Sequence, residues 1–234
     1  MNRLFIAKDQ LPIIRGSDAH HLKNVLRSRI GDEIELFDGS GMVYLAKITK
    51  IEKDSIITEI ISQHRSENEP KVKITLAQAL PKGNKMDFIV EKCVELGVSK
   101  IIPMLTERTI GKAVKFERWQ KLAKEAAEQS GRAIVPSIEP LMNFAEVLKL
   151  KAQFDLFLIP WELEKERTLK SALTIQQSNN PTILLLIGPE GGFSQKEVEA
   201  AKKAGFTSIS LGKRILRTET AGMAAIAIIN YELE

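Results

Sequence analysis

A glycine-rich loop follows one of the most apolar stretches of the chain. Residues 187–194 are Ile-Gly-Pro-Glu-Gly-Gly-Phe-Ser, and they come directly after Thr-Ile-Leu-Leu-Leu at residues 182–186. Glycines let backbone N–H groups approach a ligand closely and permit positive φ, while Pro189 stiffens the turn. The loop therefore suits a pocket built from main chain, although a tight connection between a strand and a helix would have the same composition.

A second loop of the same kind lies nearer the C-terminus. Residues 209–225, ISLGKRILRTETAGMAA, contain a strand pattern, Gly212, a basic and apolar stretch, and then polar residues that begin a helix rich in alanine. In parallel α/β sheets, ligands bind outside the carboxyl ends of the strands. The two loops could face one crevice, or the small residues of the helix could simply pack it into the core.

Neither loop has the spacing of a common phosphate-binding motif. The Gly111-Lys112 pair has Thr106 where a P-loop has its first glycine, and no G-x-G-x-x-G follows a strand. Sites for nucleoside triphosphates and NAD are therefore disfavoured. The single cysteine, Cys93, excludes an internal disulfide, and the three histidines lack the spacing of a zinc site, so we expect no metal.

The elements that must position these loops belong to two regions with different periodicities. Between residues 31 and 61, short runs rich in β-branched and aromatic residues alternate with polar turns, which predicts a small antiparallel sheet or barrel. Residues 63–70, QHRSENEP, contain no apolar residue and are typical of a linker between domains. We therefore expect a domain boundary between residues 68 and 69.

After Pro70 the pattern changes to alternating strands and helices. Apolar strand candidates alternate with helices that end at Gly97 and Gly131, and Ser194 and Glu197 form a capping box after the first loop. A last helix is expected from about Thr220 to the C-terminus. This alternation predicts an α/β domain with a mostly parallel sheet covered on both faces.

The composition fits a cytoplasmic protein. The chain has 234 residues, of which 44% are hydrophobic, so it can form a substantial core. Its net charge of +4 favours a polyanionic partner only weakly. No apolar segment approaches the roughly 20 residues of a membrane span, and the first residues contain too short an apolar run for a signal peptide. We expect a soluble protein with no membrane contact.

The two C-terminal loops together resemble the signature of one enzyme family. IGPEGGFS followed by LGKRILRTETA is similar to the paired motifs of the 16S ribosomal RNA uridine-N3 methyltransferase family (RsmE), within the SPOUT superfamily. That family also has stretches similar to HHLKNVLRSRIGDEIELFDGSG, KGNKMDFIVEKCVELGVSKIIP, ERT and AAEQSGRAIVPSI. The resemblance extends over nearly the whole chain.

This resemblance implies a fold and a reaction. It implies a small PUA-like β-barrel that binds RNA, residues 1–68, and an α/β SPOUT domain, residues 69–234, whose C-terminal segments form a trefoil knot. It also implies a homodimer that binds S-adenosylmethionine in the knot and methylates N3 of one uridine in the 16S rRNA of the small ribosomal subunit. The alternatives are a methyltransferase for another RNA position and a non-catalytic RNA-binding or ribosome-assembly protein.

Both loops supply residues expected to bind the cofactor. Adenine is an apolar plate with hydrogen-bonding edges, so main-chain groups can bind its edges while aliphatic side chains pack on its faces. The expected cofactor-binding residues are Ile187, Gly188, Pro189, Gly191, Gly192, Leu211, Gly212, Ile215, Leu216, Thr218 and Ala221.

Three charged residues are candidates for the chemistry. N3 of uridine carries a proton at neutral pH, so its methylation requires a base or a cation that stabilises the uridine anion. Arg217 is the candidate cation, with a surface or phosphate contact as its alternative role. Glu190 and Glu219 could accept the proton or orient the base, although Glu219 could instead be a favourable charge at a helix N-terminus.

Basic residues are candidates for RNA contacts. The stretch HHLKNVLRSR combines an apolar stripe, Leu22, Val25 and Leu26, with cations that suit either phosphate contacts or a solvated helix face. Two lysines beside Gly83 could extend the same surface, and an arginine after Gly131 lies near the substrate in the family, unless it only complements a helix C-terminus. The expected RNA-binding residues are His20, Lys23, Arg27, Arg29, Lys82, Lys85 and Arg132.

Overall fold

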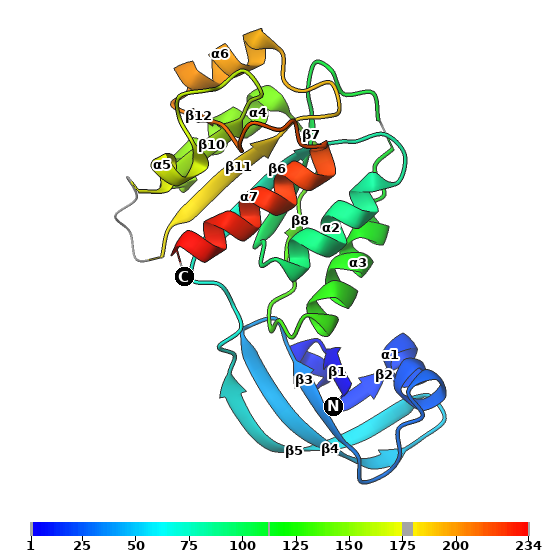
Figure 1. Ribbon diagram of the computed structural model, residues 1–234. Coiled ribbons are helices and arrows are strands. Elements are labelled where there is room, and N and C mark those ends of the chain that lie inside the picture. The colour runs from blue at the N-terminus through cyan, green and yellow to red at the C-terminus, as the bar shows by residue number, and fades with distance from the viewer. Residues whose placement is uncertain (1, 112, 175–179, 234) are drawn as a thin grey trace. The chain divides into compact units, whose positions relative to one another are not determined.

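The computed structural model describes residues 2–111, 113–174 and 180–233. The chain forms two compact units (Figure 1). The first contains Met1–Glu69 together with Ala127–Val135, and the second contains Pro70–Ala126 and Pro136–Glu234. The first unit is therefore built from two separate segments of the sequence.

The first unit is a five-stranded sheet with the strand order β1-β3-β4-β5-β2. Its strands β1 and β3 are parallel, and the other neighbours are antiparallel. Side chains such as Leu36, Ile48 and Ile56 are at most 1% exposed and form its core. The β-sheet expected between residues 31 and 61 is confirmed. The bounds are β1 (Asn2–Phe5), β2 (Ile13–Arg15), β3 (Glu33–Phe37), β4 (Met42–Ile51) and β5 (Ser55–Arg65), with a short 3-10 helix at Lys8–Gln10.

The linker expected at residues 63–70 is wrong for its first three residues. Residues 63–65 lie at the end of β5 and pair with residues 42–44 of β4. Their side chains are exposed, so their polarity reflects contact with solvent and not the absence of a strand. Residues 66–70 lie outside the strand.

A short helical segment carries the basic stretch of the first unit. The helix α1 (Gly16–His20) continues into a π-helical turn (His21–Val25). Leu22 is 1% exposed, whereas Val25 is 60% and Leu26 is 41% exposed. The expected apolar stripe is therefore wrong beyond Leu22, because the wider π-helical turn changes which residues share a face.

The second unit contains a parallel sheet with the strand order β12-β10-β11-β6-β7-β8, and β9 pairs with β7. All of these neighbours are parallel. The central strands β6 and β11 are buried along almost their whole length, as expected for a sheet covered on both faces. The bounds are β6 (Lys73–Ala79), β7 (Lys100–Leu105), β8 (Ser137–Ile138), β9 (Met142–Asn143), β10 (Leu156–Pro160), β11 (Thr182–Ile187) and β12 (Thr207–Ile209).

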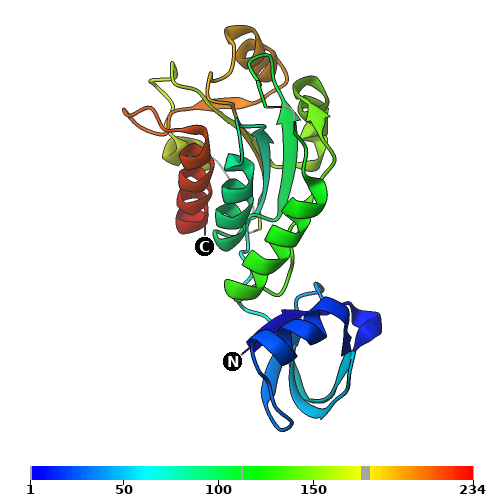
Figure 2. The same ribbon diagram turned by 90° about the vertical axis from the view of Figure 1, so that its right-hand side faces the viewer.

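Helices cover both faces of this sheet (Figures 1 and 2). On one face, α4 and α6 pack against strand side chains such as Ala77 and Leu184. On the other, α7 approaches the sheet so closely that its Gly222 lies against Leu76 and Ile187, and α2 lies beside α7. The bounds are α2 (Lys85–Glu95), α3 (Phe116–Gln129), α4 (Phe144–Lys149), α5 (Leu169–Leu173), α6 (Gln195–Lys203) and α7 (Thr218–Leu233), with a 3-10 helix at Leu150–Gln153.

The expected α/β class and most helix ends are confirmed. Gly97 and Gly131 adopt positive φ just after α2 and α3, and the last helix begins at Thr218, two residues before the expected Thr220. The trefoil knot stays a prediction. Among the described residues, no helix combines the length and apolar character needed to cross a membrane.

Candidate functional site

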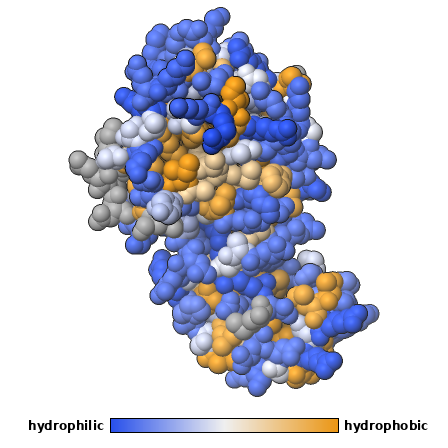
Figure 3. Space-filling view, in the orientation of Figure 1, coloured by the Kyte–Doolittle hydropathy of each residue, from blue (hydrophilic) through white to orange (hydrophobic). Residues whose placement is uncertain are grey.

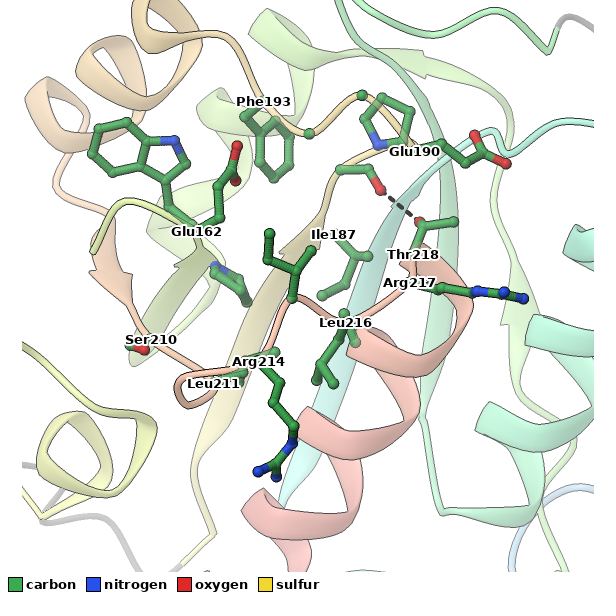
Figure 4. Close-up of a pocket in the computed structure, with 18 of the residues that line it drawn as sticks. Glu162, Ile187, Glu190, Phe193, Ser210, Leu211, Arg214, Leu216, Arg217 and Thr218 are labelled. Atoms are coloured by element: carbon green, nitrogen blue, oxygen red, sulfur yellow. Dashed lines mark hydrogen bonds between the residues drawn. The ribbon is translucent and has the colours of Figure 1, made fainter. Parts of the chain in front are cut away.

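A pocket of about 550 Å³ opens at the carboxyl ends of β10, β11 and β12 (Figure 4). This volume lies within the usual range for small-molecule sites. We call residues 187–193 the first wall of the pocket and residues 210–217 its second wall. The two loops face one crevice, as the sequence predicted. The lining residues are Lys85, Pro160, Trp161, Glu162, the two walls, Thr218 and Ala221.

The first wall is held by hydrogen bonds from distant parts of the chain. The Thr218 hydroxyl, at the start of α7, donates to the carbonyl oxygen of Gly188 over 2.6 Å. The Arg108 guanidinium, in the loop after β7, donates to the carbonyl oxygen of Gly191 over 2.8 Å. Two elements that are remote in sequence therefore fix the backbone of this wall.

Gly188 and Gly192 show why the first wall contains glycine. A Cβ atom on Gly188 would lie 3.2 Å from the ring of Phe193 and 3.3 Å from backbone carbon of Gly192. A Cβ atom on Gly192 would lie 3.0 Å from a carboxylate oxygen of Glu162, and its φ is +66°. Because neither position has room for a side chain, backbone forms the pocket surface here.

A polar network behind the first wall fixes the start of α6. The Ser194 hydroxyl donates to the Glu107 carboxylate over 2.7 Å, and the backbone N–H of Glu107 donates to the Glu197 carboxylate over 2.8 Å. Ser194 and Glu197 also form the expected capping box. The loop after β7 therefore supports the first wall through both Glu107 and Arg108.

The second wall is held much less firmly. At its start, the backbone N–H of Ser210 donates to the carbonyl oxygen of Arg167 over 2.8 Å, and the Ser210 hydroxyl contacts the backbone of Gly212. No hydrogen bond found among the described residues involves residues 213–216. Ile215 is 88% exposed. This segment therefore depends on its two ends for its position.

Lys85 joins two carboxylates at the edge of the pocket. Its ammonium nitrogen lies 2.9 Å from a carboxylate oxygen of Glu190 and 3.6 Å from one of Glu219. The backbone N–H of Lys82 donates to the same Glu190 oxygen over 3.1 Å. The start of α2 is thus connected to the first wall and to the first turn of α7.

The Lys85 contacts determine the charge state of Glu190. Burial raises the pKa of Glu190, but hydrogen bonds from Lys85 and from backbone N–H groups outweigh burial and lower the pKa below its usual value. The hydrogen bond to Glu190 in turn raises the pKa of Lys85. At neutral pH the pair is an ammonium and a carboxylate, and Glu190 is a weak base.

Glu162 differs from Glu190 in its partners. Among the described residues, none is found to form a hydrogen bond or an ion pair with it. In Figure 4 it lies across the pocket from Glu190 and Arg217. The neighbouring Trp161 ring carries the Lys202 ammonium 5.2 Å from its centroid. The Glu162 carboxylate and Arg217 therefore belong to different sides of the pocket.

The structure brings all the expected cofactor-binding residues into the lining of this pocket. Of the expected catalytic residues, Arg217 and Glu190 also line it, while Glu219 lies outside the lining and contacts Lys85. Sequence reasoning missed the pocket positions of Trp161 and Glu162. The rule that ligands bind at strand ends, applied to the strand pattern before them, could have found both.

The residues expected to bind RNA differ in their accessibility. His20, Lys23, Arg27 and Arg29 are all exposed on the first unit. Arg27 has a φ of +54°, in the left-handed region that favours glycine, so an arginine there carries backbone strain. On the second unit, Lys82 is exposed, whereas Lys85 belongs to the pocket lining and its ion pairs.

The RNA contact expected for Arg132 is wrong. Arg132 is 3% exposed, and its guanidinium lies 2.8 Å from the Glu69 carboxylate inside the first unit. The same carboxylate accepts hydrogen bonds from the backbone N–H groups of Ala133 and Ile134. The positive charge of Arg132 is neutralised by Glu69 inside the first unit, so Arg132 does not form part of a basic surface.

Two protein-family models and several proteins of known name match the sequence of this chain. A family model described as an RNA methyltransferase domain matches residues 67–230, and one described as an RNA methyltransferase PUA domain matches residues 14–61. The ribosomal RNA small subunit methyltransferase E of Bacillus subtilis is 34% identical over 94% of this chain and 90% of its own length. The protein of the same name from Synechocystis is 36% identical over 99% of this chain and 78% of its own length.

A solved structure gives the same result for the fold. The ribosomal RNA small subunit methyltransferase E of Neisseria gonorrhoeae, bound to S-adenosyl methionine, is 38% identical, with a TM-score of 0.88 over 99% of this chain and 97% of that one. The matched family model covers more than half of the chain, and the relatives match along almost all of it. The chain therefore belongs to the ribosomal RNA small subunit methyltransferase E family.

Proposed function

We propose that this chain transfers a methyl group from S-adenosylmethionine to N3 of one uridine in the 16S rRNA of the small ribosomal subunit. The observation that carries the proposal is the pocket formed by the two walls at the strand ends. Relatives named for methylation of small-subunit rRNA, one of them with S-adenosyl methionine bound, support it. We also propose that the chain works as a homodimer in the cytoplasm.

The pocket residues fit S-adenosylmethionine. The glycines of the first wall place main chain without side chains at the pocket surface, which suits the hydrogen-bonding edges of adenine, and Ile187, Leu211 and Leu216 offer apolar surface for its faces. The free carboxylate of Glu162 suits the hydroxyl groups of a ribose or a positive charge. The sulfonium of the bound cofactor would supply the methyl group.

The charged residues of the pocket suggest how uridine N3 becomes a nucleophile. Loss of the N3 proton to solvent water leaves a negative charge on the uracil ring, and this charge spreads onto the carbonyl oxygens O2 and O4. Arg217 is exposed at the end of the second wall and lines the pocket, so its guanidinium can donate to one of these oxygens. Much of the remaining acceleration comes from positioning N3 in line with the methyl group.

Glu190 is poorly suited to accept the N3 proton. Its lowered pKa and its bonds to Lys85 and to the backbone of Lys82 make it a weak base at neutral pH. It can instead hold Lys85 at the pocket edge, where the ammonium lies between the carboxylates of Glu190 and Glu219. We therefore assign the electrostatic role to Arg217, and to Lys85 the role of connecting the first wall to α7.

RNA would be held outside the pocket by the exposed cations of the first unit. His20, Lys23, Arg27 and Arg29 can contact phosphates, and the strain at Arg27 fits a residue retained for its charge. The match to an RNA methyltransferase PUA domain supports this role. Because N3 is blocked by base pairing, the target uridine must leave its stack and enter the pocket unpaired.

The test is methylation of purified substrates by the purified chain. Small ribosomal subunits and free 16S rRNA, both prepared from cells that lack this methyltransferase, are incubated with methyl-labelled S-adenosylmethionine. Nucleosides are then identified by mass spectrometry. We expect labelled N3-methyluridine in at least one of the two substrates, and the comparison between them identifies the preferred form of the RNA.

Two other outcomes would contradict the proposal. Label in a different nucleoside would mean that the chain is a methyltransferase for another RNA position. Absence of label, together with no heat on titration of S-adenosylhomocysteine, would mean a non-catalytic RNA-binding or ribosome-assembly protein.

A further inference from the structure

A glutamine is fully buried in the middle of the parallel sheet. Gln78 lies next to the last residue of β6, pairs in register with Ile187 of β11, and is 0% exposed. It does not line the pocket. Burying an amide costs free energy unless its donors and acceptors find partners, so a glutamine here requires an explanation.

The contacts of Gln78 fix the orientation of its amide. Its Nε2 atom donates to the carbonyl oxygen of Ala79 over 3.0 Å and to the Thr218 hydroxyl over 2.9 Å. Turning the amide over would place Oε1 against the Ala79 carbonyl, and two acceptors would then face each other. Nε2 therefore serves as the donor, and Oε1 lies buried without a partner among the described residues.

The hydrogen bond from Gln78 to Thr218 determines which way the Thr218 hydroxyl donates. A hydroxyl has one hydrogen, and the Thr218 oxygen accepts from Gln78, so its own hydrogen is free to point elsewhere. It points to the carbonyl oxygen of Gly188, which lies 2.6 Å away in the first wall. Figure 4 shows this last bond beside the pocket. The chain of donors thus runs from β6 through the start of α7 to the end of β11.

We propose that Gln78 is a positioning residue that holds the first wall in its cofactor-binding geometry. By donating to Thr218, it directs the Thr218 hydrogen toward Gly188 and ties the first wall to the N-terminus of α7. Gln78 acts entirely through Thr218 and does not touch the ligand. This inference rests on the proposed function, because its effect is measured on binding of the cofactor product.

The sharpest test is Gln78→Glu, which keeps the size and shape of the side chain but turns the donor into an acceptor. The acid has at most one hydrogen for the two acceptors that Nε2 serves, the Ala79 carbonyl and the Thr218 oxygen, so the Thr218 hydrogen can turn toward the acid and away from Gly188. We expect calorimetry to give S-adenosylhomocysteine affinity about tenfold weaker than wild type, the effect of losing one good hydrogen bond. Gln78→Met removes the donor without adding an acceptor, so the Thr218 hydroxyl is no longer directed but can still donate to Gly188, and we expect a smaller loss of about threefold.

A double-mutant cycle separates positioning from packing and does not require Gln78→Glu to fold. Thr218→Val should weaken S-adenosylhomocysteine binding about tenfold, and Thr218→Ser, which keeps the hydroxyl, should stay within about threefold of wild type. If Gln78 acts only through Thr218, then adding Gln78→Met to Thr218→Val causes no further loss. Thermal unfolding confirms that each variant compared is folded at the titration temperature.

The failures of the two proposals differ. Equal affinities of Gln78→Glu and wild type, or losses that multiply in the Gln78→Met and Thr218→Val double variant, would overturn the positioning role alone. Absence of S-adenosylhomocysteine binding by the wild-type chain would contradict the proposed function itself.

Discussion

The two walls of the pocket are both glycine-containing loops at strand ends, but they are held very differently. Thr218, Arg108 and the Glu190–Lys85 ion pair connect the first wall to three other parts of the second unit. Among the described residues, no comparable bond reaches residues 213–216 of the second wall, where Ile215 is 88% exposed. Figure 3 shows apolar and strongly polar surface side by side on this face of the molecule.

The difference in how the two walls are held indicates that they contribute differently to ligand binding. A wall that is fixed before the ligand arrives loses little conformational entropy on binding, whereas a weakly held wall must be ordered at that moment. We infer that the backbone of the first wall is already in its binding geometry before the ligand arrives. The second wall becomes ordered on binding and contacts the ligand through its own side chains. The following experiments test that contrast.

The largest expected effect comes from overfilling the first wall. Gly188→Val adds a side chain where a Cβ atom already lies 3.2 Å from the Phe193 ring. We expect S-adenosylhomocysteine affinity to fall by up to about 100-fold, since overpacking costs up to about 3 kcal/mol. Calorimetry measures it.

Gly212→Ala is the matched change in the second wall. Nothing lies within 4 Å of the added Cβ atom, and only the φ of +111° strains it. Its loss of affinity should be below about tenfold. Equal losses from the two glycine variants would remove the distinction between a fixed wall and an adaptable one.

The second largest effect should separate chemistry from binding. Arg217→Ala removes the guanidinium at the end of the second wall, so we expect kcat to fall roughly tenfold to 100-fold while S-adenosylhomocysteine affinity stays within about twofold. Single-turnover methylation and calorimetry measure the two quantities. Arg217→Lys is the control for charge without the planar fork. A loss of affinity as large as the loss of kcat would mean that Arg217 binds the cofactor.

A smaller effect should appear when Glu190→Gln removes the charge that ties the first wall to Lys85. The pKa of Glu190 lies below its ordinary value of 4.5. The ion pair therefore contributes stability that is complete above pH 4.5 and is lost as pH falls through the lower folded-state pKa. Thermal unfolding should give a lower Tm for Glu190→Gln near neutral pH, with the gap to wild type narrowing in acid. A gap that stays constant in acid would contradict this.

The smallest expected effect is a change in hydrogen-exchange protection of the unsubstituted chain when a ligand binds. Saturation with S-adenosylhomocysteine should slow hydrogen exchange at the backbone amides of residues 213–216, which have no hydrogen bond among the described residues. The amide of Gly192, already bonded to the Pro189 carbonyl over 2.9 Å, should change less. Mass spectrometry of short peptides measures both. The reverse ranking would mean that the first wall is the one that orders on binding.

Local chemistry made much of the fold predictable. Gly97 and Gly131 end helices because only a left-handed residue closes them well, and Ser194 with Glu197 begins one because both side chains satisfy free N–H groups. A continuous apolar run identified β11 because both faces of its sheet are covered. The π-helical turn at His21–Val25 has no comparable local signal, so the face of Val25 was misjudged.

The candidate site was predictable to the extent that it is contiguous in sequence. Both walls are single stretches, and their glycines mark them. Lys85 and Glu162 reach the pocket from other elements, and their positions depend on strand order and on partners far away in the chain. Arg132 was misjudged for the same reason, because its burial depends on Glu69, which the sequence assigned to a linker.

The ion pair between Glu69 and Arg132 limits how the RNA-binding region can be moved. The Glu69 carboxylate is 11% exposed, and its hydrogen bonds among the described residues come from Arg132, Ala133 and Ile134, which follow α3 in the sequence. A fragment cut near residue 69 would keep the acid and discard its partners, leaving a desolvated charge uncompensated. Grafting this region onto another enzyme, or exchanging it between relatives by recombination, therefore requires two separate pieces of sequence to travel together.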